Sequence, residues 1–196
     1  MKKLFLIQSL LGVITMTFLF SCGESNKEAE ITNLSSNESL VKHGEYLVKI
    51  MGCNDCHSPK NMGANGPEID MARRLSGYPS SRVMPPIDTN VVKNGFILFI
   101  GDLTASVGPW GNSFAANITS DSATGIGKWT EDQFRRAILQ GKFNGDKNGR
   151  MILPPMPWQE FSNLNDEDVT AIFAYLKSTN PVENKVPEPI AFKDLK

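Results

Sequence analysis

One pentapeptide limits the fold of this chain more than any other stretch, namely Cys53-Asn54-Asp55-Cys56-His57. The pattern C-x-x-C-H is typical of a c-type haem attachment site, in which two thiols bond to the haem and the adjacent histidine binds its iron. A zinc site would need further thiol or imidazole ligands, yet the chain has only three Cys and two His. A redox dithiol is expected beside a βαβ pattern, which the flanking sequence lacks. Because the motif occurs once, we predict one covalent haem c held by Cys53, Cys56 and His57.

The N-terminal residues 1–21 have the layout of a secretory signal peptide, with two lysines followed by a mostly apolar run that ends at Phe20. This run is short for a membrane span and contains polar residues, which disfavours the alternative of a retained membrane helix. Leu19-Phe20-Ser21-Cys22 resembles a bacterial lipoprotein box, with Cys22 as the lipidated first residue of the mature chain. The sequence therefore predicts an extracytoplasmic protein that is anchored in the membrane by lipid and faces the periplasm.

The rest of the chain divides by composition into a tether, one domain and a tail. Residues 22–39 are poor in apolar side chains and are predicted to form a flexible tether. Residues 40–182 suit a single domain, and residues 183–196 are expected to form a C-terminal tail. The 20 Lys and Arg residues nearly balance the 21 Asp and Glu residues and form no basic stripe, so nucleic acid is not expected as a partner.

Two helices follow from local signals in the second half of the chain. Asn165 is a good N-cap and is followed by an acidic first turn. Val169 then begins an apolar i, i+3, i+4, i+7 pattern. Thr130 and Gln133 form the sequence of a capping box, and Gly141 is a C-terminal stop.

A third helix is predicted before the motif, from about Glu38 to Met51, with Gly52 closing it. Residues 58–129 hold many Gly, Pro, Asn and Ser residues, so long regular elements are not expected there. The exception is the apolar run 96–100, which we interpret as either a short buried strand or a helical turn.

The second axial ligand decides between electron transfer and ligand chemistry. Met156 is our choice, because prolines on both sides stiffen the chain that would hold its thioether. Met84 is the runner-up, and Met151 is close enough to Met156 to be confused with it. His43 lies on the helix that leads into the motif, which makes a return to the opposite haem face difficult, so we interpret it as a surface histidine.

The chain resembles the class I cytochrome c family over about residues 42–182. The resemblance rests on the motif, on Gly44-Glu45-Tyr46-Leu47, on the segment 124–130 (Thr-Gly-Ile-Gly-Lys-Trp-Thr) and on Pro155-Met156-Pro157-Trp158. Cytochrome subunits of bacterial membrane-bound dehydrogenases are similar to it, most of all in the segment 124–130. The family resemblance implies an all-α fold of helices wrapped around one covalent haem.

Two further expectations come from the resemblance. The first and last helices should cross near the haem, with Gly44 and Tyr175 at the contact. A proline carbonyl, of either Pro67 or Pro59, should accept the N–H of the proximal histidine. The departure from the family is a long irregular insert, residues 68–116.

The predicted function is electron transfer by a haem with His57 and Met156 as axial ligands, in a carrier and not an enzyme. Its partners would be other extracytoplasmic redox proteins, a dehydrogenase or an oxidase. Two alternatives stay open. One is a haem enzyme or ligand-sensing subunit with an open sixth position, and the other is a fixed cytochrome subunit of a dehydrogenase complex.

Overall fold

The computed structural model describes residues 25–195, and its contacts divide the chain between Ser39 and Leu40. The predicted signal peptide and Cys22 lie outside the described residues. No helix within 25–195 is both long and apolar enough to cross a membrane. The elements follow one another in the order α1 (Ser25–Ile50), α2 (Cys53–His57), β1 (Lys60–Gly63), β2 (Gly66–Ile69), η1 (Met71–Arg73), α3 (Thr89–Lys93), β3 (Leu98–Phe99), β4 (Ala105–Gly108), β5 (Gly111–Phe114), α4 (Glu131–Gln140), η2 (Phe143–Gly145), α5 (Trp158–Phe161), α6 (Asp166–Ser178) and η3 (Phe192–Asp194).

The first helix begins at Ser25, earlier than the predicted start near Glu38. The coil predicted for the tether is therefore wrong for residues 25–39, which are helical. The physical reason is that residues 25–43 contain neither Gly nor Pro, so nothing in the sequence interrupts a helix that continues toward the N-terminus. The low apolar content of this segment indicates that it is not buried in a core, but it does not prevent the segment from forming a helix.

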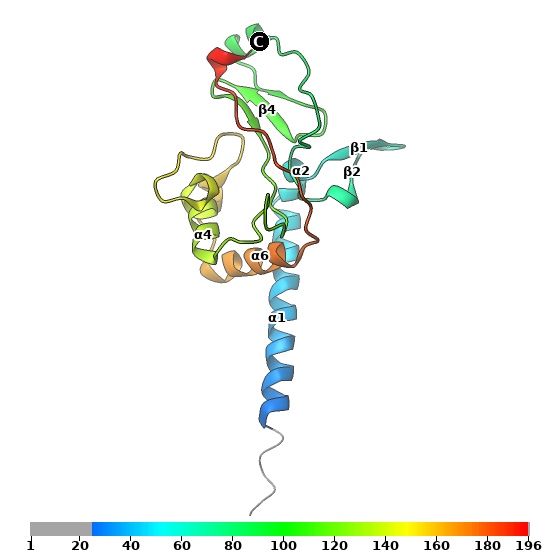
Figure 1. The fold of residues 1–196 in the computed structure, drawn as a ribbon, viewed down its shortest axis with the longest axis vertical. Helices are drawn as coiled ribbons and strands as arrows, with labels where there is room; N and C mark the ends of the chain where they lie inside the picture. Colours follow the sequence, from blue (N-terminus) through cyan, green and yellow to red (C-terminus); the bar gives the residue numbers. More distant parts are fainter. Residues whose placement is uncertain (1–24, 196) are drawn as a thin grey trace, which may run out of the picture. The chain divides into compact units, whose positions relative to one another are not determined.

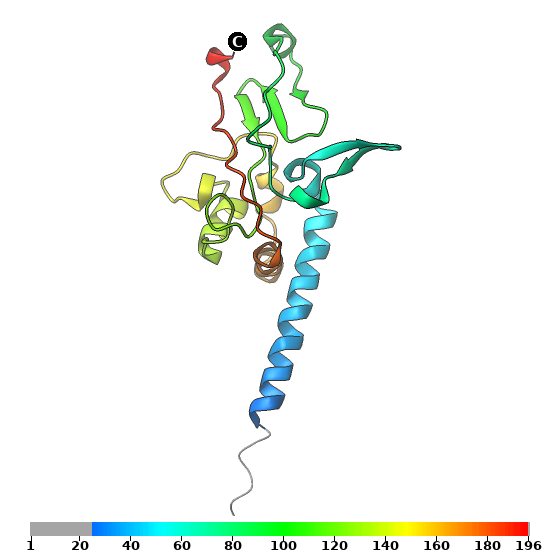
Figure 2. The same cartoon turned by 45° about the vertical axis from the view of Figure 1, so that its right-hand side comes forward.

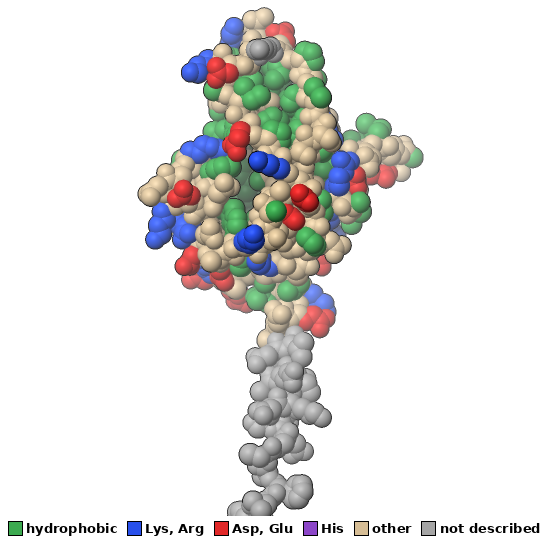
Figure 3. Space-filling view, viewed as in Figure 1, with side chains coloured by type: hydrophobic (Ala, Val, Ile, Leu, Met, Phe, Trp, Pro, Cys, Tyr) green, Lys and Arg blue, Asp and Glu red, His purple; other side chains and the backbone are tan. Residues whose placement is uncertain are grey.

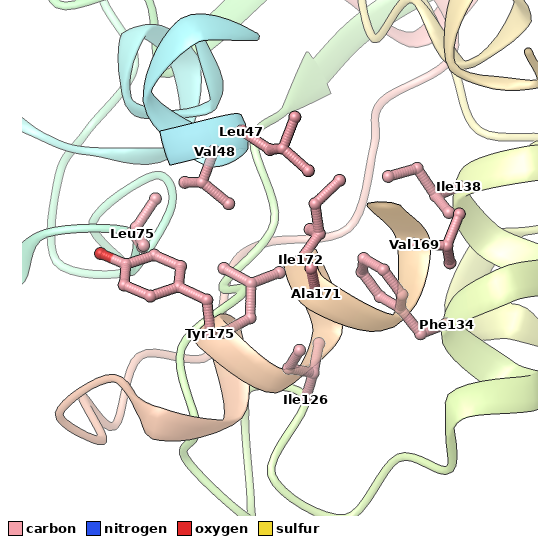
Figure 4. Packing of buried hydrophobic residues seen from close by; sticks show 11 residues of the cluster. Leu47, Val48, Leu75, Ile126, Phe134, Ile138, Val169, Ala171, Ile172 and Tyr175 are labelled. Atoms are coloured by element: carbon pink, nitrogen blue, oxygen red, sulfur yellow. The ribbon is translucent and has the colours of Figure 1, made fainter. Parts of the chain in front are cut away.

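Helices α1, α4 and α6 bury one apolar core, which Figure 4 shows from close by. Helix α4 begins at the predicted capping box, in which the Thr130 hydroxyl accepts from Gln133 N–H and the Gln133 side chain accepts from Thr130 N–H. Helix α6 begins at the predicted N-cap, where the Asn165 side chain accepts from Asp168 N–H. The α6 side chains in the core are Val169, Ala171, Ile172, Tyr175 and Leu176, and they meet Leu47 and Val48 of α1 and Phe134 and Ile138 of α4.

The crossing of α1 and α6 depends on a glycine, as predicted. A Cβ atom built on Gly44 would lie 1.9 Å from the carbonyl oxygen of Ala171 and 2.8 Å from Cβ of Tyr175. The two helix backbones therefore approach each other more closely than any side chain at position 44 permits.

The expectation of an all-α fold is not confirmed, because two small antiparallel sheets accompany the helices (Figure 1). Strands β1 and β2 form a hairpin that projects from the domain in both views (Figure 2). Strands β3, β4 and β5 form a three-stranded sheet within the predicted irregular insert. These strands have at most four residues each, too short for an alternating pattern to be recognised among the glycines and prolines around them.

The apolar run of the insert is not buried as a unit. Only Leu98 and Phe99 form a strand, β3, and Phe96, Ile97 and Phe99 are all exposed to solvent. The run therefore contains a short strand, but our prediction that such a strand is buried was wrong. Phe96 and Ile97 precede the strand, whereas Leu98 and Phe99 line a cavity together with Met84 and Ile87. Hydrophobic side chains are also visible on the face of the protein that Figure 3 shows.

The segment predicted as a tail packs on the domain. Asn112 and Ile190 form an antiparallel bridge, and the buried Asn184 side chain donates to the carbonyl oxygens of Ser76 and Tyr78. Asn117 also binds this segment, since its amide donates to the carbonyl oxygen of Asn184 at 3.4 Å. Residues 183–195 thus belong to the contact unit that begins at Leu40.

Candidate functional site

The motif residues lie on α2, a single helical turn that starts after Gly52. Gly52 adopts a left-handed conformation, with φ of 72°, which ends α1 and reverses the chain into α2. Cys53 and Cys56 are three residues apart and therefore share one face of this turn. Both are free thiols and half-buried. Burial raises the pKa of Cys53 to about 11 and also raises that of Cys56, which the Lys60 ammonium opposes.

His57 is held in one orientation at the end of α2. Its Nδ1–H donates to the carbonyl oxygen of Ala116 at 2.7 Å, because a carbonyl can only accept. The Nε2 lone pair is thereby left for a metal. Burial lowers the pKa of His57, and the bond to Ala116 opposes this. The side chain is therefore a buried neutral imidazole, the form that binds iron.

The acceptor of the His57 proton was predicted incorrectly. Pro59 is buried and its carbonyl oxygen accepts from Asp70 N–H, while Pro67 lies in the β1–β2 hairpin. Ala116 takes their place because the insert returns directly after β5 to the motif helix. No feature of a single sequence indicates that the side chain of residue 57 bonds to the backbone of residue 116.

Arg74 joins the motif helix to α6 and was not identified from the sequence. Its Nε donates to Oδ1 of Asn54 at 2.8 Å, and a second guanidinium nitrogen donates to the Tyr175 hydroxyl at 2.5 Å. Asn54 is buried and Arg74 is half-buried. One charged side chain thus fixes the orientation of α2 against the helix crossing.

Met156 lies half-buried on a strap, residues 151–158, that is fixed at both ends. At its start Ile152 N–H donates to the carbonyl oxygen of Gly141 at 2.7 Å. Near its middle the hydroxyl of Ser113, in β5, donates to the carbonyl oxygen of Pro154 at 2.7 Å. At its end the ring of Trp158 packs so closely on Gly141 that a Cβ there would lie 2.4 Å from it. The predicted stiffness of this strap is therefore reinforced by contacts that the sequence did not indicate.

The other methionines occupy different surroundings. Met84 lines an apolar cavity of about 480 Å³ on the insert, together with Pro85, Ile87 and Leu98. Met62, Met71 and Met151 are exposed.

His43 is a partly exposed surface histidine, as predicted, and its Nε2 lies 2.7 Å from a carboxylate oxygen of Asp168. Within the described residues, 25–195, no three His, Cys, Asp or Glu side chains are grouped so that they could hold a metal ion.

The sequence model of the cytochrome c family matches residues 41–180. The chain belongs to the cytochrome c family. Its cofactor is covalently bound haem c, and the single C-x-x-C-H motif accounts for one haem.

Among the relatives of this cytochrome is the gluconate 2-dehydrogenase cytochrome c subunit of Pantoea cypripedii. It is 27% identical over 194 residues, which cover 96% of this chain and 34% of the relative. The cytochrome c subunit of the quinone alcohol dehydrogenase of Gluconobacter oxydans (strain 621H) is 28% identical over 156 residues, or 78% of this chain and 25% of the relative. The fructose dehydrogenase cytochrome subunit of Gluconobacter japonicus is 27% identical over 182 residues, or 91% of this chain and 30% of the relative. The chain thus spans about a third or less of the length of these relatives.

The residues of the site fit haem c. Two free thiols share one helical face, and the adjacent imidazole is buried with Nδ1 occupied and Nε2 available. Figure 3 shows a hollow in this face of the protein, with hydrophobic side chains at its floor and both basic and acidic side chains near its rim. The donor set of two thiols and one neutral imidazole is that of covalent haem c attachment.

Proposed function

We propose that the protein is an electron carrier in which His57 and Met156 bind the haem iron from opposite faces. When bound, the haem supplies an iron that accepts and releases one electron. The observation that carries the proposal is the fixed, buried and neutral imidazole of His57, with Nδ1–H bonded to Ala116. A ligand held in one orientation, with burial favouring its neutral form, keeps the same geometry in both oxidation states, so electron transfer needs little rearrangement.

Met156 is the proposed second ligand because its strap limits the motion of its thioether. The strap is bonded to the end of α4 through Gly141 and to the insert through Ser113. A thioether held in this way loses little further freedom on binding, which favours ligation over an open position. The rivals are less suitable, since Met84 lies among the apolar residues of the insert cavity and Met151 is exposed.

We infer that the electron donor is a dehydrogenase. The support is that the relatives named above are cytochrome subunits of gluconate, alcohol and fructose dehydrogenases. In this role the chain accepts electrons from a catalytic subunit and passes them to a further redox protein. Co-purification with a dehydrogenase after mild detergent extraction tests this, and recovery of a cytochrome free of any dehydrogenase contradicts a fixed complex.

We also propose that Cys22 carries lipid and anchors the protein on the periplasmic side of the membrane. The proposal rests on the N-terminal sequence alone. Cys22→Ser should release a red, haem-containing protein into the soluble extracytoplasmic fraction. Retention in the membrane after removal of residues 1–21 contradicts the anchor.

The experiment that tests the carrier function asks whether the sixth position is closed. We expect the reduced wild-type protein to leave its absorption spectrum unchanged under carbon monoxide, and the oxidised protein to ignore cyanide on short exposure. Met156→Ala serves as the positive control, because removal of the thioether opens the position and carbon monoxide should then bind. Rapid binding of carbon monoxide or cyanide to the wild-type protein, or turnover of peroxide, would instead indicate a haem enzyme or ligand sensor.

A further inference from the structure

The Lys60 ammonium is held by three backbone carbonyl oxygens beside the motif helix. Its Nζ donates to Asp55 at 2.5 Å, to Asp102 at 2.8 Å and to Ser58 at 3.3 Å. An ammonium has three N–H donors, and these three acceptors use all of them. Two of the acceptors flank Cys56 and His57 in the chain, and the third belongs to the insert.

The motif helix α2 has a carbonyl oxygen, that of Asp55, which accepts a hydrogen bond from the Lys60 side chain. The carbonyl oxygen of Asp55 would accept from the N–H of residue 59 if α2 continued, but residue 59 is a proline and has no N–H. Lys60 follows at once and supplies the missing donor from its side chain. A cation at the C-terminal end of a helix also interacts favourably with its exposed carbonyl groups.

The insert presents its acceptor from a turn that is rigidly held. The peptide between Asp102 and Leu103 donates its N–H to the carbonyl oxygen of Ile100 at 2.9 Å and offers its carbonyl oxygen to Lys60. Leu103 takes a positive φ of 65°, which is unfavourable for a residue with a Cβ. The buried Asp102 carboxylate fixes this turn through a 2.5 Å bond from Arg82.

The charge of Lys60 is not cancelled by a carboxylate. Among the described residues, the ion pairs of His43, Arg73, Arg82 and Arg135 do not include Lys60. The three carbonyl dipoles hold the ammonium in place without removing its unit charge.

We propose that the insert fixes the Lys60 ammonium beside the haem-attachment helix and that this cation raises the reduction potential of the haem. The inference rests on the proposed electron-transfer function. Uptake of one electron lowers the charge of the haem site by one, so a fixed positive charge nearby stabilises the reduced form. Half-burial protects the interaction from solvent screening. Lys60 thus acts through its charge alone, and the insert gains a role in setting the potential by holding Lys60 in place.

The test is a spectroelectrochemical titration of the purified haem-loaded protein. We expect Lys60→Met to lower the midpoint potential, with about a tenfold lower ratio of reduced to oxidised protein at a fixed potential, equivalent to 59 mV for one electron. Lys60→Arg keeps the charge and should stay near the wild-type value. Lys93→Met removes the same charge from an exposed site in the insert and is the matched control, with no expected shift.

Several outcomes separate this inference from its rivals. A Lys60→Met protein that is less stable but has the wild-type potential would show a merely structural clamp and overturn the proposal. If Lys60→Met fails to retain haem, Lys60→Gln decides instead, because its amide can still donate to the carbonyl oxygens but carries no charge; it should lower the potential, and an unchanged value overturns the proposal. Failure of the carrier function itself would be seen in the wild-type protein, as the absence of a reversible one-electron couple.

Discussion

The helix crossing at Gly44 gives the sharpest stability prediction. In an exposed helix, Gly→Ala stabilises by about 0.5 to 1 kcal/mol, because glycine loses more chain entropy on folding. Here the added Cβ would lie 1.9 Å from the Ala171 carbonyl oxygen, whereas ordinary contact begins near 3.4 Å. The helices must therefore separate by over an ångström across a close-packed core that includes Val48 and Ile172. Overpacking of this kind costs about 1 to 3 kcal/mol, so we expect Gly44→Ala to lower the free energy of unfolding by about 2 kcal/mol.

The assay is urea unfolding of the haem-loaded protein, followed by far-ultraviolet circular dichroism. Glu45→Ala, on the exposed side of the same helix, is the control and should change stability by less than about 0.5 kcal/mol. Because the closest atom belongs to the backbone, the double variant Gly44→Ala, Ala171→Gly should be no more stable than Gly44→Ala, and the added helical glycine should lower its stability further. Rescue by Ala171→Gly, or a stable Gly44→Ala protein, would refute the reasoning.

Two further predictions concern charged side chains around the motif. Arg74→Met removes the hydrogen bonds that join α2 to α6 and should cost about 2 kcal/mol in urea unfolding, whereas Arg73→Met, whose side chain is 41% exposed in its pair with Asp70, should cost less than about 1 kcal/mol. Burial alone would raise the pKa of Asp102, but hydrogen bonds from Arg82 and Thr104 outweigh it and hold that pKa below its ordinary value of 3.8. The stability from this ionised carboxylate is present above pH 3.8 and is lost as pH falls through the lower folded value. Asp102→Asn should therefore be less stable than the wild-type protein at neutral pH and lose less on acidification below pH 3.8, and parallel stability curves would contradict this.

Features set by a few neighbouring residues could be predicted from the sequence. The capping box at Thr130 and the N-cap at Asn165 are signals within one helical turn, and the structure confirms both. The contact of Gly44 with Tyr175 was implied by the family resemblance and is also confirmed. Cys53 to His57 are likewise contiguous, and the family match confirms covalent haem c.

Features that join distant parts of the chain could not be predicted. The acceptor of the His57 proton is Ala116, 59 residues away, and any backbone carbonyl could have served. The sheet of the insert depends on pairing between strands of two to four residues, too short for a period-2 pattern. The early start of α1 was missed for another reason, because a segment with few apolar residues was interpreted as coil although it contains no helix breaker.

The most direct test of the account is the near-infrared absorption of the oxidised protein, where a methionine sulfur bound to ferric haem gives a charge-transfer band. We expect the band in the wild-type protein, its loss in Met156→Ala together with a lower reduction potential, and its retention in the matched variant Met84→Ala. A band that survives in Met156→Ala and disappears in Met84→Ala would contradict the assignment of Met156 and place the second ligand in the insert.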